Sequence, residues 1–145
     1  MVSNDTDRGW DMVIVEGKIR GKQRPRMTRG GHVYTPNQTV TYEKQIKDCY
    51  KKQCGEFLEG EVKADIVAYY KVPKSYPKKR QKIIEDNLEY PMKKPDLDNV
   101  AKVVLDSLNG VAYKDDAQVI ELNMKKRYTF DEERLEFELH KAINK

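Results

Sequence analysis

The segment EVKADIVAYYKV, Glu61 to Val72, constrains the fold more than any other part of this sequence. In an extended strand, alternate side chains point to opposite faces. Val67 and Tyr69 fall on one face here, and the other face takes Val62, Ala64, Ile66 and Ala68. Apolar side chains on both faces are typical of a strand with a neighbour on each side. The segment therefore predicts a long strand at a central position in a sheet.

The segment after Pro95 has a helical period. Steps of about 100° per residue place one set of apolar side chains on a single face: Leu97, Val100, Ala101, Val104, Leu105 and Leu108. Asp98, Lys102 and Asp106 recur at every fourth residue along the opposite edge, and Asn109-Gly110 supplies a C-terminal stop. One face of this helix is therefore expected in the core, while one edge carries acid, base and acid.

Other patterns predict the remaining elements. A helix capped by Asn37 or Thr39 is expected through Gln53, with an apolar side made of Val40, Ile46, Cys49 and Tyr50. Strands are expected over 11–19, around Ile120, Leu122 and Met124, and over 134–143, with an irregular hairpin over 21–36 and a short helix within 78–90. With residues 1–10 as a tail and 11–145 as one domain, these elements predict a small α+β protein with a mixed or antiparallel sheet packed with helices.

Lysine and arginine gather in two runs that contain no acidic residue. One run covers 17–31 and the other covers 71–82, although the net charge of the whole chain is only +4. A single charge run is typical of a solvated surface, but two runs that flank an acidic cluster favour a polyanion as partner.

Several classes of protein are excluded by simple features. Cys49 and Cys54 are spaced C-x4-C with no histidine near them in sequence, so neither a zinc motif nor a disulfide framework is indicated. No apolar run approaches the about 20 residues needed to span a bilayer. A reduced, cytoplasmic protein is the simplest interpretation.

Acidic residues gather at the ends of the predicted helix. Asp96 and Asp98 lie at its start, and Asp115-Asp116 open the strand that follows it. If that strand packs beside the helix start, the carboxylates can converge as ligands for Mg²⁺, which selects carboxylate oxygens and water. The alternative is that Asp96 only caps the helix and Asp115-Asp116 only form a turn. The lysine one turn from Asp98, at position 102, favours the metal interpretation because it could reach a phosphate.

The segment KPDLDNVAKVVLDSLNGVAYKDDAQV resembles the signature of the RusA-type Holliday junction resolvases, a family common in phages and prophages. The elements are D-x-D-N, a lysine four residues past the second aspartate, L-D-x-L and D-D-x-Q-V. The basic KQRPRMTRGGHVYTP is similar to the N-terminal region of phage and Gram-positive members. The resemblance implies a small α+β homodimer that cleaves four-way DNA junctions symmetrically in recombination and repair, with Mg²⁺ or Mn²⁺.

Carried over residue by residue, the resemblance implies roles for the acids and the lysine. Asp96, Asp98 and Asp116 are implied as catalytic metal ligands, and Lys102 as the catalytic lysine. Asp115 is implied as a neighbouring acid in the metal site. Matching on D-D-x-Q-V favours Asp116 over Asp115 as the direct ligand, although the length of the preceding loop leaves the choice between them open.

Supporting and DNA-binding roles are implied as well. Asn99 is expected to hold the metal ligands in position without binding the metal itself. Asp106 is expected either to do the same or to pair with Lys102. DNA phosphates are expected to contact the two basic runs through Arg20, Lys22, Arg24, Arg26, Arg29, Lys78, Lys79 and Arg80. Two alternatives stay open: a non-catalytic DNA-binding protein, and a broader Mg²⁺-dependent nuclease for flaps or forks.

Overall fold

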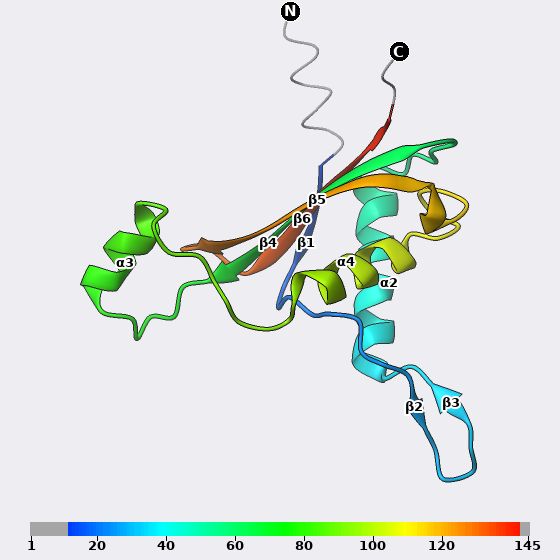
Figure 1. The fold of residues 1–145 in the computed structure, drawn as a ribbon, viewed down its shortest axis with the longest axis horizontal. Helices are drawn as coiled ribbons and strands as arrows, with labels where there is room; N and C mark the ends of the chain where they lie inside the picture. The colour runs from blue at the N-terminus through cyan, green and yellow to red at the C-terminus, as the bar shows by residue number, and fades with distance from the viewer. Residues whose placement is uncertain (1–11, 143–145) are drawn as a thin grey trace, which may run out of the picture.

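The computed structural model describes residues 12–142; the tail expected over 1–10 and Asp11 lie outside them. The described chain forms a mixed sheet with helices against one face (Figure 1). The strands lie in the order β1 (Val13–Glu16), β6 (Arg134–Lys141), β4 (Val62–Lys71) and β5 (Val119–Thr129). The expected α+β class with a mixed sheet is confirmed.

Strand β4 is the central strand, as its sequence predicted. It pairs with β6 in antiparallel orientation and with β5 in parallel orientation. A parallel pair needs a crossover connection, which the segment containing α3 (Lys78–Glu85) and α4 (Leu97–Ser107) supplies. Residues of β4 alternate between buried and half-buried, with Val67 and Tyr69 on the half-buried face. One face of the sheet is therefore core and the other is open.

The core lies between the sheet and two helices, α2 (Asn37–Gln53) and α4. Its largest fully buried side chains include Tyr50, Tyr70, Tyr113 and Phe137. The rings of Tyr50 and Phe137 stack with centroids 6.4 Å apart. Because aromatic side chains each bury about 150 to 250 Å², they fill most of the space between the layers.

Helix α2 differs from the sequence prediction in its N-cap residue and in the face that it buries. Pro36 is the N-cap of α2, so neither Asn37 nor Thr39 caps it, and the Thr39 hydroxyl donates to Gln23 instead. The buried stripe of α2 contains Tyr42, and Val40 is half exposed. The prediction that Val40 faces the core was wrong, because Val40 lies about 100° around the helix from the buried Thr39.

Strand β5 forms one edge of the sheet, and its side chains are mostly exposed. Ile120 and Leu122 are 58% and 43% exposed. They share a face with the half-buried Met124, as predicted. Their position on an edge strand keeps them at the surface.

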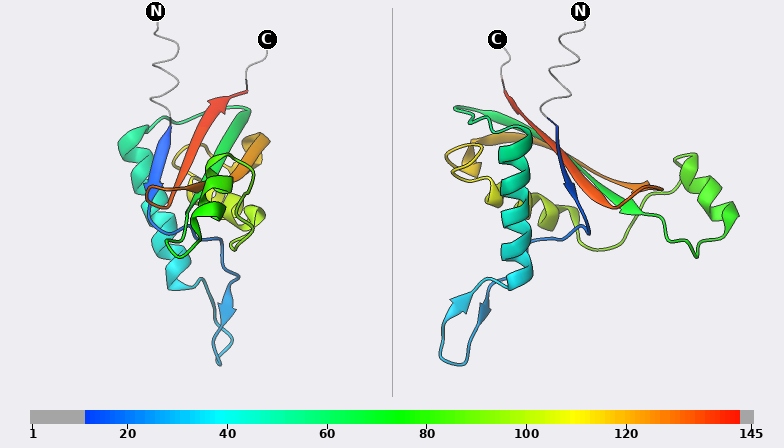
Figure 2. Two further views of the ribbon diagram at one scale, coloured as in Figure 1. Left: turned by 90° about the vertical axis from the view of Figure 1, so that its left-hand side faces the viewer. Right: turned by 180° about the vertical axis from the view of Figure 1, so that it is seen from behind.

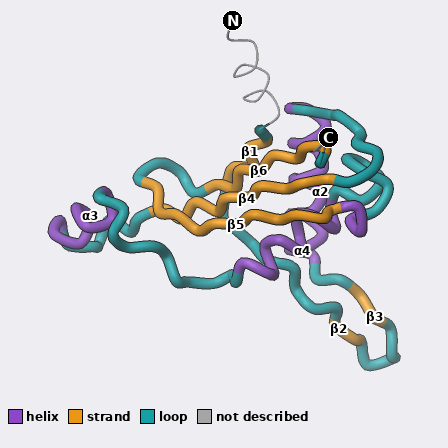
Figure 3. Tube along the Cα trace, turned by 45° about the horizontal axis from the view of Figure 1, so that its top comes forward, coloured by secondary structure: helices purple, strands orange, loops and turns teal. Residues whose placement is uncertain are grey.

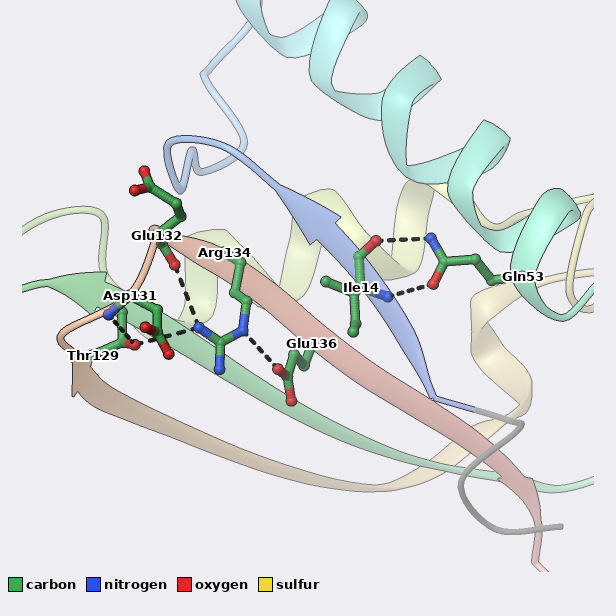
Figure 4. Close-up of polar contacts among 7 residues, drawn as sticks. All are labelled: Ile14, Gln53, Thr129, Asp131, Glu132, Arg134 and Glu136. Atoms are coloured by element: carbon green, nitrogen blue, oxygen red, sulfur yellow. Dashed lines mark hydrogen bonds and ion pairs between the residues drawn. The ribbon is translucent and has the colours of Figure 1, made fainter. Parts of the chain in front are cut away.

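The opposite edge of the sheet, strand β1, is protected by a side chain (Figure 4). The Gln53 amide accepts a hydrogen bond from the Ile14 backbone N–H and donates one to the Ile14 carbonyl, both at 2.8 Å. These bonds satisfy backbone groups that an edge strand would otherwise expose. On the neighbouring strand, Arg134 donates to the Glu136 carboxylate at 2.7 Å.

Two segments project from the body of the domain (Figure 2). One is the hairpin of β2 (Arg26–Met27) and β3 (Val33–Tyr34), which confirms the expected irregular hairpin. The other carries α3 on extended connections. No helix within residues 12–142 is long and apolar enough to cross a membrane.

Candidate active site

The start of α4 presents Asp96 and Asp98 at the surface. Asp96 occupies the N-cap position, and its backbone carbonyl accepts from the Asn99 and Val100 N–H groups. Its exposed side chain makes no capping hydrogen bond, so the capping alternative for Asp96 is not realised. Asp98 lies in the first turn of the helix, where its Oδ1 accepts from the Asn99 N–H at 3.0 Å.

A buried tyrosine from the central strand holds the backbone that leads into α4. The Tyr70 hydroxyl donates to the Pro95 carbonyl at 3.2 Å. Burial raises the pKa of Tyr70 to about 12, and the negative charges of Glu133 and Asp96 contribute to this shift. The hydroxyl therefore stays protonated at neutral pH and remains a hydrogen-bond donor beside Asp96.

Lys22 links the basic loop to the edge of α4. Its backbone N–H donates to the Asn99 carbonyl at 2.9 Å, and its Nζ lies 2.6 Å from Glu43 and 3.4 Å from Asp106. Partial burial opposes the charge of Lys22, but the carboxylates of Glu43 and Asp106 outweigh it and raise its pKa. The suggested pairing of Asp106 with Lys102 is therefore replaced by a pairing of Asp106 with Lys22.

A pocket of about 350 Å³ adjoins the start of α4. Its lining includes Lys18, Arg20, Lys22 and Lys94 together with Asp96. Four cationic side chains can bind a phosphate group. The neighbouring carboxylate can bind a cation that this phosphate approaches. The sequence predicted basic residues near the acids, but the loop geometry that forms this pocket was not predictable from composition.

Asp115 and Asp116 open the turn before β5 and have different surroundings. The Asp115 side chain accepts from the Ala117 N–H at 2.8 Å and caps the short 3₁₀ helix η1 (Asp116–Gln118). The Asp116 backbone N–H instead donates to Asn109 Oδ1 at 2.7 Å, and the Asp116 carboxylate lies close enough to Asp106 and Asp115 to be affected by their charges. Burial raises the pKa of Asp116, and the charges of Asp106 and Asp115 raise it further.

The closeness of Asp116 to Asp106 and Asp115 has a chemical consequence. Negative charges that are held near one another repel and disfavour the ionised state of Asp116. A divalent cation can be bound by such carboxylates and relieve the repulsion. The donor set at the end of α4 therefore fits a hard cation such as Mg²⁺.

The acids form two groups along α4 instead of one cluster at its start. Asp98 and Asp106 are eight residues apart, which is about 12 Å along a helix axis. Among the described residues, Asp96, Asp98 and Asp116 do not bring their ligand atoms within 4.8 Å of one another. The turn before β5 packs beside the end of α4, because the loop that connects the helix to this turn is short. Lys102 is exposed on the helix between the two groups.

The DNA-binding candidates also differ in their surroundings. Arg24, Arg26 and Arg29 are exposed on the projecting hairpin. Lys78 and Lys79 are exposed at the start of α3. Arg80 donates to both oxygens of the Glu89 carboxylate and lies 3.8 Å over the Tyr76 ring, so it also stabilises the projecting segment that carries α3.

Gln118, the fourth residue after Lys114 and part of D-D-x-Q-V, has a role that the motif did not reveal. Its Oε1 accepts from the Lys114 and Asp115 N–H groups, and its Nε2 donates to the Leu58 and Gly60 carbonyls at 3.2 and 2.9 Å. One side chain thus ties the acidic turn to the loop before β4.

Replacing Gln118 with Ala should loosen the acidic turn. We expect a loss of about 1 to 2 kcal/mol in the free energy of unfolding, because each net hydrogen bond contributes about 0.5 to 1.5 kcal/mol and part of the site is exposed. Urea denaturation measures this loss. The control is Gln38→Ala in the exposed first turn of α2, and an equal loss in both variants would contradict the proposed role of Gln118.

Comparison with known proteins identifies the family. The family model described as endodeoxyribonuclease RusA matches residues 16–140. The chain belongs to the RusA endodeoxyribonuclease family. This confirms the resemblance stated from the sequence and places the chain among nucleases. It is also similar to uncharacterized protein YqaN of Bacillus subtilis (strain 168), with 32% identity over 126 residues that cover 85% of this chain and 86% of YqaN.

Proposed function

We propose that this RusA-family chain resolves four-way DNA junctions in recombination and repair, by metal-dependent hydrolysis of phosphodiester bonds in the cytoplasm. The observation that carries the proposal is the gathering of Asp106, Asp115 and Asp116 at the end of an exposed helix edge that also presents Asp98 and Lys102, where burial and the neighbouring charges raise the pKa of Asp116. A protein that only binds DNA has no physical reason to gather carboxylates beside its DNA-binding surface, because their charges repel phosphate.

The proposed cation ligands form two sets, Asp96 and Asp98 at the start of α4, and Asp116 with Asp115 beside it at the end of the helix. Bound Mg²⁺, or Mn²⁺ in its place, would neutralise charge on the scissile phosphate and acidify a bound water. The Lys102 ammonium lies between the two acid groups and would stabilise negative charge that develops on the phosphate oxygens. Water adds to phosphorus as one P–O bond breaks, which leaves a phosphate on one DNA end and a hydroxyl on the other.

The remaining residues position the reacting groups and the DNA. Asn99 supports the start of α4 through its backbone contact with the Lys22 N–H, and Asp106 holds Lys22 at 3.4 Å. The exposed bases of the hairpin and of α3 are proposed to contact the phosphates of the junction arms. A homodimer would present two such helix edges, one to each of the two strands that symmetric resolution must cut.

The test is cleavage of a synthetic mobile four-way junction in Mg²⁺, with linear duplex of the same sequence as control. Wild type is expected to make paired symmetric nicks in the junction only, and Asp98→Asn to bind the junction without cutting it. Equal cutting of flaps and forks would instead indicate a broader branched-DNA nuclease. Binding without cutting by wild type, in both Mg²⁺ and Mn²⁺, would indicate a DNA-binding protein without nuclease activity.

A further inference from the structure

A second set of potential metal ligands lies on the open face of the sheet, away from α4 and the catalytic acids. Asp65 projects from β4, and Glu138 and His140 project from β6. Figure 3 looks onto this face, with the helices behind the strands. The ligand atoms of the three side chains all lie within 4.8 Å of one another, and each residue is partly buried.

The separations within this set match those in a metal site. His140 Nε2 lies 3.3 Å from Asp65 Oδ2 and 3.5 Å from Glu138 Oε1. Ligands at about 2.0 to 2.2 Å from a tetrahedral Zn²⁺ are separated from one another by about 3.3 to 3.6 Å. Both separations also exceed the about 2.9 Å that is usual for an N–H···O hydrogen bond. The imidazole nitrogen and two carboxylate oxygens are thus spaced as neighbouring ligands of one ion.

The charges around this set favour a bound cation. Asp65 and Glu138 are directly paired across the two strands, and like charges in that arrangement destabilise a sheet. Lys63 lies on this face opposite His140, but its Nζ is directed to Glu121 on β5, 3.6 Å away. Within residues 12–142, the only ion-pair partner of Asp65 and of Glu138 is the imidazole of His140. A neutral imidazole does not balance the negative charges of two carboxylates.

We propose that Asp65, Glu138 and His140 bind one first-row transition-metal dication of the Zn²⁺ class and thereby link β4 to β6. An imidazole ligand favours Zn²⁺, Co²⁺ or Ni²⁺ over Mg²⁺, which prefers oxygen ligands only. Three protein ligands leave a fourth position for water or for a group from a partner. The set consists of residues on two paired strands, so the ligands are held in place by the ladder itself and not by a mobile loop. The site is separate from the proposed nuclease function.

The test is titration of the full-length, tag-free chain with Co²⁺ in buffer that contains excess Mg²⁺, followed by visible absorption and by thermal unfolding. Wild type is expected to bind one Co²⁺ with the absorption of a low-coordinate site and to gain thermal stability. Zn²⁺ should displace the Co²⁺ signal, whereas further Mg²⁺ should leave it unchanged.

Two variants and one matched control make the result specific. His140→Gln and Asp65→Asn should each weaken Co²⁺ binding by more than the roughly 10- to 100-fold that follows loss of an outer partner of a metal ligand. His32→Gln, at the other histidine of the sequence and on the exposed hairpin, should bind as wild type does. The absence of Co²⁺ binding by wild type, or equal binding by His140→Gln, would overturn the site. Loss of binding in Asp98→Asn but not in His140→Gln would place the ion at the catalytic acids and would also overturn it.

Discussion

Asp116→Asn is expected to lower the rate of junction cleavage by about 10²- to 10³-fold or more while junction binding persists. Losses of this size follow the removal of one group that stabilises charge in the transition state. The structure adds a reason specific to this position, because Asp116 carries its charge close to the charges of Asp106 and Asp115. An asparagine keeps the shape of the side chain, but it removes the charge that would hold a cation.

The same substitution should stabilise the folded chain when Mg²⁺ is absent. Burial and the charges of Asp106 and Asp115 raise the pKa of Asp116 in the folded state. The folded chain therefore binds this proton more tightly than the unfolded chain, and stability falls as the pH rises through the folded-state pKa. Above that pKa, asparagine removes the repulsion, and we expect a gain below about 1 kcal/mol because the site is near the surface.

The measurements are single-turnover cleavage rates and thermal unfolding at neutral pH, with and without Mg²⁺. Mg²⁺ should raise the unfolding temperature of wild type more than that of Asp116→Asn, since a ligand of the folded state stabilises in proportion to its binding. Asp131→Asn, an exposed acid in the turn between β5 and β6, is the control. If Asp116→Asn cleaves as fast as wild type, Asp116 is not part of the catalytic site.

Gly21→Ala is expected to destabilise the fold by about 1 to 3 kcal/mol, the usual cost of forcing an extra carbon into a packed region. A Cβ at this position would lie 2.8 Å from the Asn99 Cβ and 3.0 Å from the Pro95 Cβ. Both atoms are next to the backbone at the start of α4, so neither can rotate away. The loop must move instead, and it carries the Lys22 N–H that donates to the Asn99 carbonyl.

This displacement should reduce cleavage as well as stability, because the loop lines the basic pocket beside Asp96. Urea denaturation and cleavage rates under fully folded conditions separate the two effects. Gly30→Ala is a matched control, since a Cβ there meets nothing closer than 3.8 Å. It should change stability by no more than about 0.5 kcal/mol, as most surface substitutions do. If Gly21→Ala and Gly30→Ala have equal stability and equal cleavage rates, the close approach of Gly21 to Asn99 and Pro95 is not needed for either property.

Local patterns in the sequence determined most of the elements. The alternation in 61–72 predicted the central strand, and the period after Pro95 predicted α4, because burial on one side selects side chains at a fixed spacing. The prediction was poorer for the direction of a helix face. Val40 was expected in the core, and Tyr42 is buried there instead, since the direction of a helix face depends on what packs against it.

The candidate site shows the same difference between local patterns and packing. Motif spacing and the helical period were enough to predict which acids gather near α4, because both are local properties. The packing of the elements brings Asp116 near Asp106 at the end of the helix, pairs Lys22 with Asp106, and places Asp65 beside His140 across two strands. These contacts join residues from different elements, and their partners are set by how the elements pack and by strand register, which no single stretch of sequence specifies.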